Sequence, residues 1–277
     1  MQKVPKTQKI LGGTDLAAYI KQRQAGEVRA LRQAHGIQPK LAIVMTGGND
    51  VIDVYVRMKK KYGADILIDV DIHKIEQAAI PDLLKKLNDD ASVQGIIIQL
   101  PLSDTSQTEQ IVELVNPAKD VDALGSRATC EPATPMAILW LLAGYNVDLK
   151  DKQILLVGRG KLVGAPLERM MRASGLNVSV ADRKTVDLQA DCLAADVIIT
   201  ATGQPGIIKS DMLKSGAVVV DAGVASESGK TVGDLAEDVY LRNDITVTPL
   251  KGGVGPLTVC ALFENVIRAT RASQEVI

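Results

Sequence analysis

The sequence predicts an α/β protein of two domains, each built on a mostly parallel sheet that is covered by helices. Short, continuously apolar runs such as residues 41–45 and 154–157 are typical of strands that are buried on both faces. Segments with helical periodicity alternate with these runs along most of the chain, which is the pattern of a doubly wound sheet. With 277 residues, the chain is long enough for two domains of ordinary size.

The first half of the chain is expected to contain strands that alternate with helices. The strands are expected at residues 41–45, 66–70 and 95–100, and the helices at 15–34, 51–62, 75–89 and 108–115. Thr14 is a suitable N-cap for the first helix. Ligands of such sheets bind at the carboxyl ends of the strands, where Gln99 and the turn at residues 46–49 lie.

The second half begins after a proline-containing connector at residues 127–135, which is the expected domain boundary. A helix is expected at 136–143, and strands at 154–157, 178–181, 196–200, 217–220 and 245–247. A loop rich in glycine, residues 252–256, precedes a final helix that Thr258 can cap. The expected domains are an α/β catalytic domain of residues 1–130 together with the C-terminal helix 258–277, and a Rossmann-type dinucleotide-binding domain of residues 131–257, with a cleft between them.

The glycine-rich segment after residues 154–157 has the strand, turn and helix order of a dinucleotide-binding fingerprint. Gly158 is expected to allow the tight turn, and Gly160 to let the backbone approach a pyrophosphate. The first N–H groups of the following helix would then face the anion. Because the spacing to Gly164 is one residue longer than usual, an αβ unit with a small-residue turn and no ligand is the alternative.

Composition excludes several classes of function. The net charge of −1 and the aromatic content of 3% give no support for binding nucleic acid or an anionic membrane surface. The 3 cysteines are far apart and lack metal-ligand spacing, so we expect reduced, structural thiols and no metal. The N-terminus lacks the apolar segment of a secretory signal, and no apolar run approaches the roughly 20 residues that cross a bilayer. We therefore expect a soluble cytoplasmic protein.

Tyr55 and Lys59 occupy positions i and i+4 of an expected helix, so both side chains leave the same side of it. A lysine can act as a general base only if its pKa falls toward neutrality, and burial together with cations such as Arg57 would lower it. The alternative is a solvated basic helix face with a half-buried tyrosine. A Tyr-x-x-x-Lys pair also occurs in short-chain dehydrogenases, but there it follows the glycine fingerprint, whereas here it precedes it.

Two further polar residues lie where chain segments end. Gln99 ends a strand before Leu100 and Pro101, so its side chain can hold a hydrogen bond where the ladder stops. Asp122 follows residues 119–121 in a loop without expected regular structure. Taken singly, Gln99 is also explained as a polar strand end, and Asp120 and Asp122 as turn residues.

Taken together, the motifs resemble those of the bifunctional methylenetetrahydrofolate dehydrogenase/methenyltetrahydrofolate cyclohydrolase family. The matching segments occur in the family's order and cover nearly the whole chain. They are YVRMK at 55–59, GIIIQLPL at 95–102, KDVD at 119–122, PATP at 132–135, GRGKLVGAP at 158–166, GQPG at 203–206, DAG at 221–223 and TPLKGGVGPLT at 248–258. The long final motif is highly specific.

The resemblance implies roles for a catalytic set of four residues. Lys59 would assist breakdown of the imidazolidine ring adduct and hydrolysis of the methenyl product, and Gln99 would hold Lys59 in position. Asp122 would grip the amino edge of the pterin, and Tyr55 would stack on the p-aminobenzoyl group. Further implied substrate-binding residues are Leu100, Pro101, Gly252, Gly253, Val254, Gly255, Pro256 and Thr258.

The resemblance also implies the reaction. A hydride would pass from 5,10-methylenetetrahydrofolate to a nicotinamide cofactor, and water would then add to the methenyl carbon to give 10-formyltetrahydrofolate. The cofactor would carry the redox chemistry while the protein supplies orientation and a tuned base. A homodimer is implied as well.

The sequence departs from the family pattern in several places. These are Ile52 for a serine, Gln94 for an aspartate, Ala133 for a cysteine, Gly160 for a serine and Lys251 for a proline. The loop after Asp122 is also shorter. These differences leave a second hypothesis, a folate- or nucleotide-binding homologue with impaired catalysis. A third is a dehydrogenase of amino or hydroxy acids, although no paired cationic clamp for a carboxylate is found.

The sequence contains features that favour NADP and others that favour NAD. Asp182 ends the second strand of the nucleotide domain, where an acid binds a ribose 2′-hydroxyl and disfavours a 2′-phosphate. The nearby guanidinium groups suit a phosphate, but this basic cluster could equally be a solvated loop. We expect NADP, which the family mostly uses, with NAD as the alternative. The expected cofactor-binding residues are Gly158, Arg159, Gly160, Val163, Gly164, Asp182, Arg183, Lys184, Thr202 and Gly203.

Overall fold

The computed structural model describes residues 9–47, 50–223, 225–227 and 230–275, and the chain divides into two compact units. The first unit contains residues 1–17 and 134–258, and the second contains residues 18–133 and 259–277. Helices α1 (Gly13–His35) and α8 (Val254–Glu275) each begin in the first unit and end in the second. The predicted two-domain α/β architecture is confirmed.

The second unit is built on a three-stranded parallel sheet in the order β3-β2-β4. Its strands are β2 (Lys40–Met45), β3 (Asp69–Lys74) and β4 (Gly95–Ile98). Helix α2 (Asp50–Asp65) connects β2 to β3. The turn η1 (Gln77–Ala79) and helix α3 (Ile80–Asp89) connect β3 to β4, after which η2 (Thr105–Gln107) and α4 (Thr108–Val112) follow.

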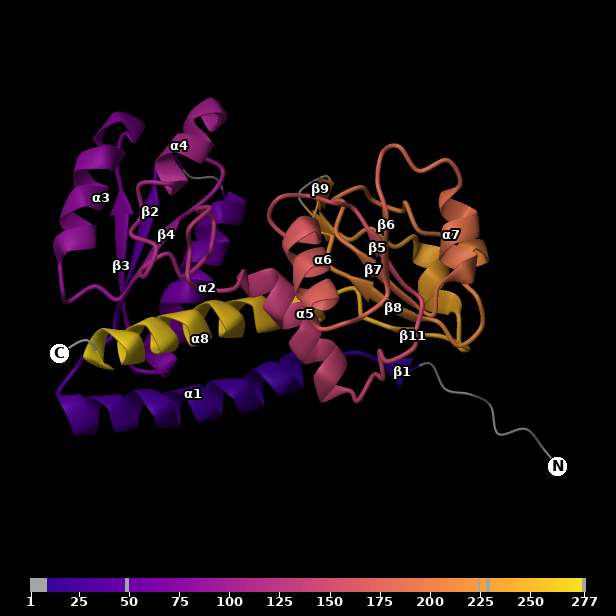
Figure 1. Cartoon of the computed structure of the whole chain (residues 1–277), viewed down its shortest axis with the longest axis horizontal. Helices are drawn as coiled ribbons and strands as arrows, with labels where there is room; N and C mark the ends of the chain where they lie inside the picture. The colour runs from indigo at the N-terminus through magenta and orange to yellow at the C-terminus, as the bar shows by residue number, and fades with distance from the viewer. Residues whose placement is uncertain (1–8, 48–49, 224, 228–229, 276–277) are drawn as a thin grey trace. The chain divides into compact units, whose positions relative to one another are not determined.

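This sheet is covered on both faces. On one face, Val44 and Ile98 pack with Leu84 of α3 and Ile111 of α4 in a single buried cluster, and both helices lie beside the sheet in Figure 1. On the other face, Gly63 of α2 approaches both β3 and α8, and the rings of Tyr62 and Phe263 stack with centroids 5.0 Å apart. Burial on two faces explains why β2 and β4 are continuously apolar.

The first unit contains a six-stranded parallel sheet in the order β1-β11-β8-β7-β5-β6. Its strands are β1 (Lys9–Ile10), β5 (Ile154–Val157), β6 (Val178–Ala181), β7 (Val197–Thr200), β8 (Val218–Asp221) and β11 (Thr246–Val247). The chain runs from β5 to β6 on one side and returns to β7 on the other. The strand order therefore reverses beside β5, which is the switch point at which α/β sheets bind ligands.

The other elements of the first unit connect these strands. They are α5 (Ala133–Gly144), α6 (Gly164–Ala173), α7 (Leu188–Ala194), η3 (Ser210–Met212), the antiparallel pair β9 (Ala225–Glu227) and β10 (Lys230–Val232), and η4 (Glu237–Leu241). Residues 9–17 cluster in this unit, although the sequence placed them in the other domain. The reasons are the pairing of β1 with β11 and the hydrogen bonds between Gly12 and the hydroxyl of Tyr145, at 3.0 and 2.8 Å.

The C-terminal helix begins four residues earlier than predicted. Residues 252–256 were expected to form a loop, but α8 starts at Val254, since a proline such as Pro256 is tolerated in the first turn of a helix. Thr258 is therefore not an N-cap: its Oγ1 donates to the carbonyl of Val254 at 3.4 Å, inside the helix. That part of the prediction is wrong.

The second strand of the first half is also shifted. Residues 66–70 were expected to be a strand, but β3 is Asp69–Lys74. Ile66 and Ile68 are buried at the end of α2 instead, where Leu67 has a φ of 65°. Of the turn predicted at residues 46–49, Gly48 and Asn49 lie outside the described residues.

Cys130, Cys192 and Cys260 are not joined in a disulfide; the first is half-buried and the other two are buried. Among the residues that the structure describes, none of the helices combines the length and the apolar character that crossing a bilayer requires.

Candidate functional site

The side chains of Lys59 and Gln99 are joined by a hydrogen bond at the carboxyl end of β4. Lys59 lies on α2, and its Nζ donates a hydrogen bond of 2.9 Å to Oε1 of Gln99. The backbone N–H of Gln99 donates to the carbonyl of Val44 at 2.8 Å, and its Nε2 donates to the carbonyl of Leu100 at 3.0 Å. Because the amide nitrogen is held by Leu100, the amide oxygen is directed at Lys59.

Burial sets the ionisation of this site. Burial lowers the pKa of Lys59, and the carboxylate of Asp122 partly opposes that shift. Burial likewise raises the pKa of Asp122, and Lys59 partly opposes the rise. The amine and the carboxylate therefore interact, and the low-polarity surroundings favour the neutral form of each. At a given pH, a larger fraction of such a lysine is neutral than of an exposed lysine, and only the neutral amine can accept a proton.

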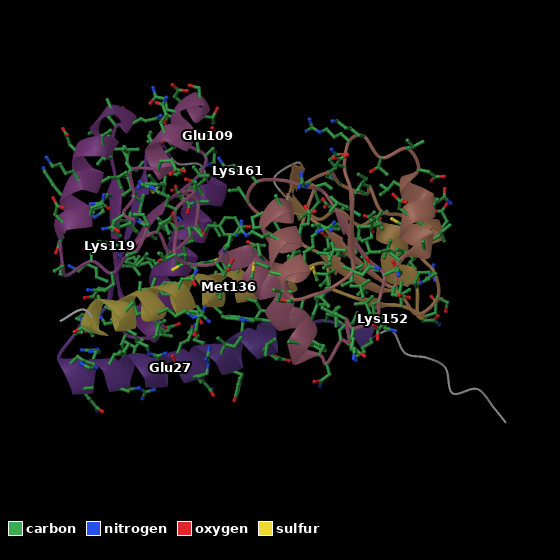
Figure 2. The ribbon with its side chains drawn as sticks, viewed as in Figure 1. Glu27, Glu109, Lys119, Met136, Lys152 and Lys161 are labelled. Atoms are coloured by element: carbon green, nitrogen blue, oxygen red, sulfur yellow. The ribbon has the colours of Figure 1, made fainter. Side chains whose placement is uncertain are left out.

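The position of Asp122 follows from the residues before it. Lys119, which is labelled in Figure 2, caps the end of α3 through Nζ. It donates to three carbonyls, at Leu87 (3.0 Å), Asn88 (2.7 Å) and Asp90 (2.7 Å). The carbonyl of Lys119 accepts from the N–H of Ile96 at 2.7 Å, and Asp120 pairs with Ile96 as a parallel bridge. Residues 119–121 therefore run along β4, and Asp122 follows directly.

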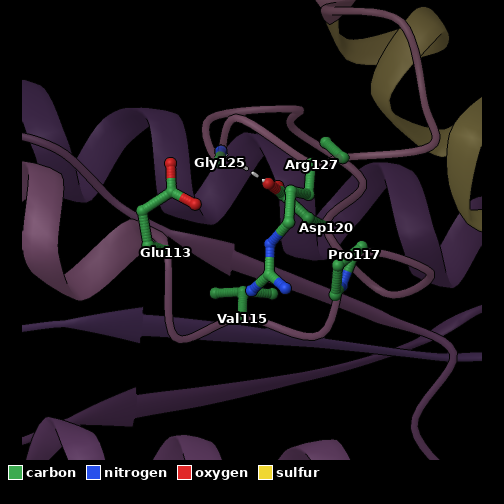
Figure 3. A pocket seen from close by; sticks show the side chains of 7 residues that line it. Glu113, Val115, Pro117, Asp120, Gly125 and Arg127 are labelled. Atoms are coloured by element: carbon green, nitrogen blue, oxygen red, sulfur yellow. Dashed lines mark hydrogen bonds between the residues drawn. The ribbon is translucent and has the colours of Figure 1, made fainter.

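The short loop after Asp122 is folded around two carboxylates. Asp120 is buried and accepts from the N–H groups of Gly125 at 2.8 Å and Leu124 at 3.4 Å. Glu113 accepts from the N–H of Ser126 at 2.7 Å and from its hydroxyl at 3.0 Å. Figure 3 shows Asp120 bonded to Gly125 beside Glu113 and Arg127, around a small hollow. The shortened loop is therefore held by hydrogen bonds to Asp120 and Glu113, which both precede it in the chain.

Asn265 of α8 is a buried partner of this segment that the sequence analysis missed. It is fully buried, and its Nδ2 donates to the carbonyls of Val121 at 2.9 Å and Glu131 at 2.8 Å. One amide thus holds both the residue before Asp122 and the connector before α5. No local pattern marks it, because its partners are 144 and 134 residues away in the chain.

The other predicted substrate residues of the second unit lie near Lys59 and Gln99 in the chain. Tyr55 lies one turn before Lys59 on α2, with 38% of its surface exposed, so its ring leaves the same side of the helix. Leu100 is half-buried and Pro101 is exposed, and a cis peptide bond joins them. Their contacts with a substrate remain predictions.

The predicted glycine turn lies at the switch point of the six-stranded sheet. Gly158 directly follows β5 with a φ of 99°, and a Cβ there would lie 2.7 Å from the carbonyl oxygen of Ala201. A Cβ at Gly164, where α6 begins, would overlap the carbonyl of Gly158. The tight turn at Gly158 is therefore confirmed. At Gly160, a Cβ would meet no heavy atom of the described residues within 4 Å, so this side of the turn is open to a ligand.

Arg159 in this turn is held by a carboxylate that the sequence analysis did not identify. Its Nε donates to Oε2 of Glu168 on α6 at 2.7 Å, and this bond raises the pKa of the guanidinium. The other oxygen of Glu168 accepts from Nε of Arg172 at 3.1 Å. With 59% of its side chain exposed, Arg159 presents a fixed cation beside the open turn.

Asp182 follows β6 and caps its own loop. Its Oδ1 accepts from the N–H of Lys184 at 2.8 Å, and its own N–H donates to Oγ1 of Thr185 at 2.9 Å. Arg183 and Lys184 are exposed in the same loop.

The remaining predicted cofactor residues flank the glycine turn. Val163 is the N-cap residue of α6. Thr202 and Gly203 follow β7, the neighbour of β5 in the sheet, and Gly203 has a φ of 66°. A Cβ at Gly158 would lie 3.0 Å from Cγ2 of Thr202, so the two loops pack directly together.

The predicted glycine loop before α8 packs on the start of α1 within the first unit. Gly252 has a φ of 79°, and its carbonyl accepts from the N–H of Gly13 at 2.6 Å. A Cβ at Gly13 would overlap the carbonyl of Gly253. Val254, Gly255 and Pro256 form the first turn of α8. The sequence motif is therefore explained in part by this close backbone packing.

These two sets of residues suit different chemistry. The open glycine turn, the N-terminus of α6 and the exposed Arg159 fit the phosphates of a dinucleotide. The amine of Lys59, the amide of Gln99 and the carboxylate of Asp122 suit proton transfer and the binding of a polar heterocycle. Within the described residues, no group of three or more His, Cys, Asp or Glu side chains could hold a metal ion.

Comparisons with known proteins give one family for both units. Residues 11–122 match the catalytic domain of tetrahydrofolate dehydrogenase/cyclohydrolase, and residues 132–274 match its NAD(P)-binding domain. The chain is 34% identical to the bifunctional protein FolD of Staphylococcus saprophyticus over 95% of its own length and 97% of the relative's. For the protein of that name from a Hydrogenobaculum species, the identity is 36%, with 94% and 98% covered.

Solved structures agree with this assignment. The crystal structure of the bifunctional FolD methylenetetrahydrofolate dehydrogenase/cyclohydrolase from Campylobacter jejuni matches with a TM-score of 0.89 at 34% identity, covering 96% of this chain and 99% of that one. The Trypanosoma brucei enzyme, complexed with NADP and an inhibitor, matches with a TM-score of 0.91 at 26% identity, covering 97% and 99%.

Proposed function

The chain belongs to the tetrahydrofolate dehydrogenase/cyclohydrolase family, and we propose that it carries out both reactions of that family in one-carbon metabolism. In the first, 5,10-methylenetetrahydrofolate gives up a hydride to NAD(P)⁺, which leaves the 5,10-methenyl cation and NAD(P)H. In the second, water adds to the methenyl carbon, the bond from that carbon to N5 breaks, and 10-formyltetrahydrofolate and a proton are released.

The bond between Lys59 Nζ and Gln99 Oε1 is the observation that carries this proposal. The amine is held at 2.9 Å from a fixed amide oxygen, and burial lowers its pKa. A neutral amine in that position takes the proton from the attacking water and later returns it to N5 as the ring opens. Asp122 interacts with the same amine and is the carboxylate that binds the amino edge of the pterin.

The nicotinamide cofactor supplies the hydride acceptor when it is bound, and the glycine turn of the first unit would hold it. Gly160 leaves backbone uncovered for the pyrophosphate, Gly158 and Gly164 allow the tight turn that presents it, and the N-terminus of α6 faces the same side. Thr202 and Gly203 of the neighbouring loop complete this assignment. The impaired homologue finds no support in the site, since Lys59 and Gln99 are bonded to each other.

We assign NADP as the preferred cofactor, with NAD as a poorer one. Arg159 is exposed and its guanidinium is already oriented by Glu168, which suits a 2′-phosphate. The Oδ1 atom of Asp182 is engaged by the N–H of Lys184, so this carboxylate is only partly available to a ribose hydroxyl. The NADP complex of the Trypanosoma brucei relative is consistent with this choice.

A cytoplasmic location and a homodimeric state are the remaining parts of the proposal. The three cysteines are not joined in a disulfide, which agrees with a reducing compartment. Sedimentation of the purified chain measures the oligomeric state directly, and a monomer at micromolar concentration would exclude the homodimer.

Two absorbance assays on the full chain test the function. Reduced cofactor is followed with methylenetetrahydrofolate and either NADP⁺ or NAD⁺, and hydrolysis is followed as loss of methenyltetrahydrofolate without cofactor. Lys59→Ala should lower the hydrolysis rate by about 10²- to 10⁴-fold, the usual contribution of a general base. The control is Lys60→Ala, which removes the exposed neighbouring lysine and should leave the rate unchanged.

Absence of both activities in the unaltered chain would exclude the proposed function and favour a binding protein. Retained hydrolysis in Lys59→Ala would exclude the assignment of Lys59 as the base while leaving the overall reaction in place.

A further inference from the structure

Two carboxylates in the first unit lie beside the predicted cofactor loop and have no assigned role. Asp221 is the last residue of β8, and Asp234 follows β10 by two residues. Asp234 is fully buried, with 0% of its surface exposed. A buried carboxylate is unfavourable unless several hydrogen bonds hold it, so its partners indicate what it does.

The partners of Asp234 are the backbone N–H groups of the loop after β7. Oδ2 of Asp234 accepts from the N–H of Thr202 at 2.7 Å, and Oδ1 accepts from the N–H of Gln204 at 2.9 Å. Gly203 lies between the two donors with a φ of 66°. Hydrogen bonds to an ionised carboxylate are stronger than bonds between neutral groups. The loop is therefore folded around this side chain.

Asp221 holds Asp234 in place. Its Oδ1 accepts from the N–H groups of Asp234 at 3.1 Å and Gly223 at 2.9 Å, and its Oδ2 accepts from the N–H of Leu235 at 3.2 Å. Thr200, the last residue of β7, also donates its hydroxyl to Asp221 at 3.3 Å. The segment that carries Asp234 is thus tied to the carboxyl ends of β7 and β8.

Glycines make this arrangement possible from both sides. A Cβ at Gly223 would overlap the carboxylate of Asp234, and a Cβ at Gly233 would overlap the carboxylate of Asp221. Each carboxylate therefore packs on a glycine from the segment of the other. Such mutual packing leaves the two side chains little freedom, as a positioning device requires.

The loop held by Asp234 is in contact with the glycine turn. A Cβ at Gly158 would lie 2.7 Å from the carbonyl oxygen of Ala201 and 3.0 Å from Cγ2 of Thr202. Displacing residues 202–204 would therefore displace one wall of the turn. These loops follow β5 and β7, which are neighbours at the switch point of the sheet.

We propose that Asp234, supported by Asp221, is a positioning residue for the nicotinamide dinucleotide, which it serves by shaping residues 202–204 against the glycine turn. The proposal rests on the proposed function, which assigns Thr202 and Gly203 to the cofactor. Asp234 does not touch the cofactor itself, because its oxygens are occupied by the loop.

Asp234→Asn tests the proposal in the full chain. An asparagine keeps the shape of the side chain but presents an NH₂ group to one of the two N–H donors, so one bond is lost and two donors face each other. We expect NADP⁺ affinity, measured by calorimetry, and the KM for NADP⁺ each to worsen by about tenfold or more. The KM for methylenetetrahydrofolate and the cyclohydrolase rate, which uses no nicotinamide, should stay within about twofold.

Asp238→Asn, at an exposed carboxylate of the same unit, is the control. Asp238 also accepts a backbone N–H, from Ser210 at 3.3 Å, together with the hydroxyl of Ser210 at 2.7 Å, but it holds η3 rather than the cofactor loop. This variant should leave NADP⁺ affinity unchanged. An equal loss of affinity in both variants would overturn the proposal, because it would show a general effect of destabilising the unit.

Amide hydrogen exchange on the unaltered chain provides a test that does not depend on folding of the variant. The amides of Thr202 and Gln204 should exchange slowly even without cofactor, because Asp234 holds them. Exchange of these amides as fast as in an unfolded chain would overturn the proposal. An NADP⁺ affinity of Asp234→Asn within twofold of that of the unaltered chain would overturn it as well. If the unaltered chain bound no NADP⁺, the proposed function would fail and this inference with it.

Discussion

Replacing Gln99 by methionine removes the hydrogen-bond acceptor of Lys59 while keeping the length of the side chain. The bond lost is the 2.9 Å contact from Lys59 Nζ to Gln99 Oε1. Because the amine of Lys59 becomes charged when it takes the proton from water, this bond is then one to a charged group, which contributes about 1.5–3 kcal/mol. If the bond holds the amine during reaction, this range corresponds to a loss of about tenfold to 150-fold in the cyclohydrolase rate.

Of the two side-chain hydrogen bonds of Gln99, only the one to Lys59 should affect the rate of hydrolysis. Its Nε2 bond to the carbonyl of Leu100 fixes the amide but makes no contact with Lys59. Losing that second bond should cost about 1 kcal/mol of stability without a further effect on rate. The assay is the initial rate of methenyltetrahydrofolate hydrolysis, normalised to the folded fraction measured by circular dichroism.

Gln94→Met is the matched control at the other end of the same strand. Gln94 precedes β4, is 6% exposed, accepts from the N–H of Lys40 at 2.9 Å and donates to the carbonyl of Ala91 at 2.9 Å. It therefore loses as many hydrogen bonds as Gln99→Met, far along the strand from Lys59. This variant should melt at a lower temperature and hydrolyse at the normal rate.

Two results would refute the reasoning. One is a normal hydrolysis rate in Gln99→Met, which would mean that the bond to Lys59 is not used in the reaction. The other is an equal fall in the rates of both glutamine variants, which would attribute the loss to a weakened strand.

The remaining predictions concern pH and the cofactor. Because burial lowers the pKa of Lys59 and the neutral amine is the active form, the cyclohydrolase rate should rise with pH and level off below the ordinary lysine value of about 10.4. Asp122 raises the pKa of Lys59, so Asp122→Asn should move this limb of the pH–rate profile to lower pH, and a shift to higher pH would contradict the coupling. For the cofactor, Asp182→Ser removes a negative charge near the expected 2′-phosphate and should raise the ratio of kcat/KM for NADP⁺ over NAD⁺ by about tenfold. An unchanged ratio would place the 2′-phosphate away from this loop.

Local sequence patterns correctly predicted the elements whose conformation depends on residues that are close in the sequence. The strand at residues 154–157 and the turn at Gly158 are found as predicted, because a buried strand followed by a positive φ needs an apolar run and then a glycine. The strand at residues 178–181 is also found as predicted.

The errors arise where burial and strand pairing do not coincide. Residues 66–68 are apolar because they fill the core at the end of α2, and the true strand β3 has mostly exposed side chains because it is an edge strand of its sheet. Strand β1 has 2 residues and exists only through pairing with β11. Nothing in its local sequence marks it.

Two of the residues missed at the site, Asp234 and Asn265, share one property, which is that their partners are distant in the sequence. Asp234 binds the N–H groups of Thr202 and Gln204, and Asn265 binds the carbonyls of Val121 and Glu131. Each bonds to backbone, whose groups are the same whatever the residue type. Neither periodicity nor motif spacing can therefore report such contacts.

The segment Lys119 to Asp122 shows why a motif is not a list of functional residues. Lys119 caps α3, Asp120 folds the following loop, and Val121 packs within about 3.1 Å of the Cβ position of Gly95 while Asn265 holds its carbonyl. Only Asp122 interacts with Lys59. Lys119, Asp120 and Val121 determine the position of Asp122, so their role is structural. Substitutions of these three residues would affect the reaction by moving the carboxylate of Asp122. A substitution at residues 119–122 that lowers the rate of hydrolysis therefore identifies a catalytic role only if it also changes the pKa of Lys59.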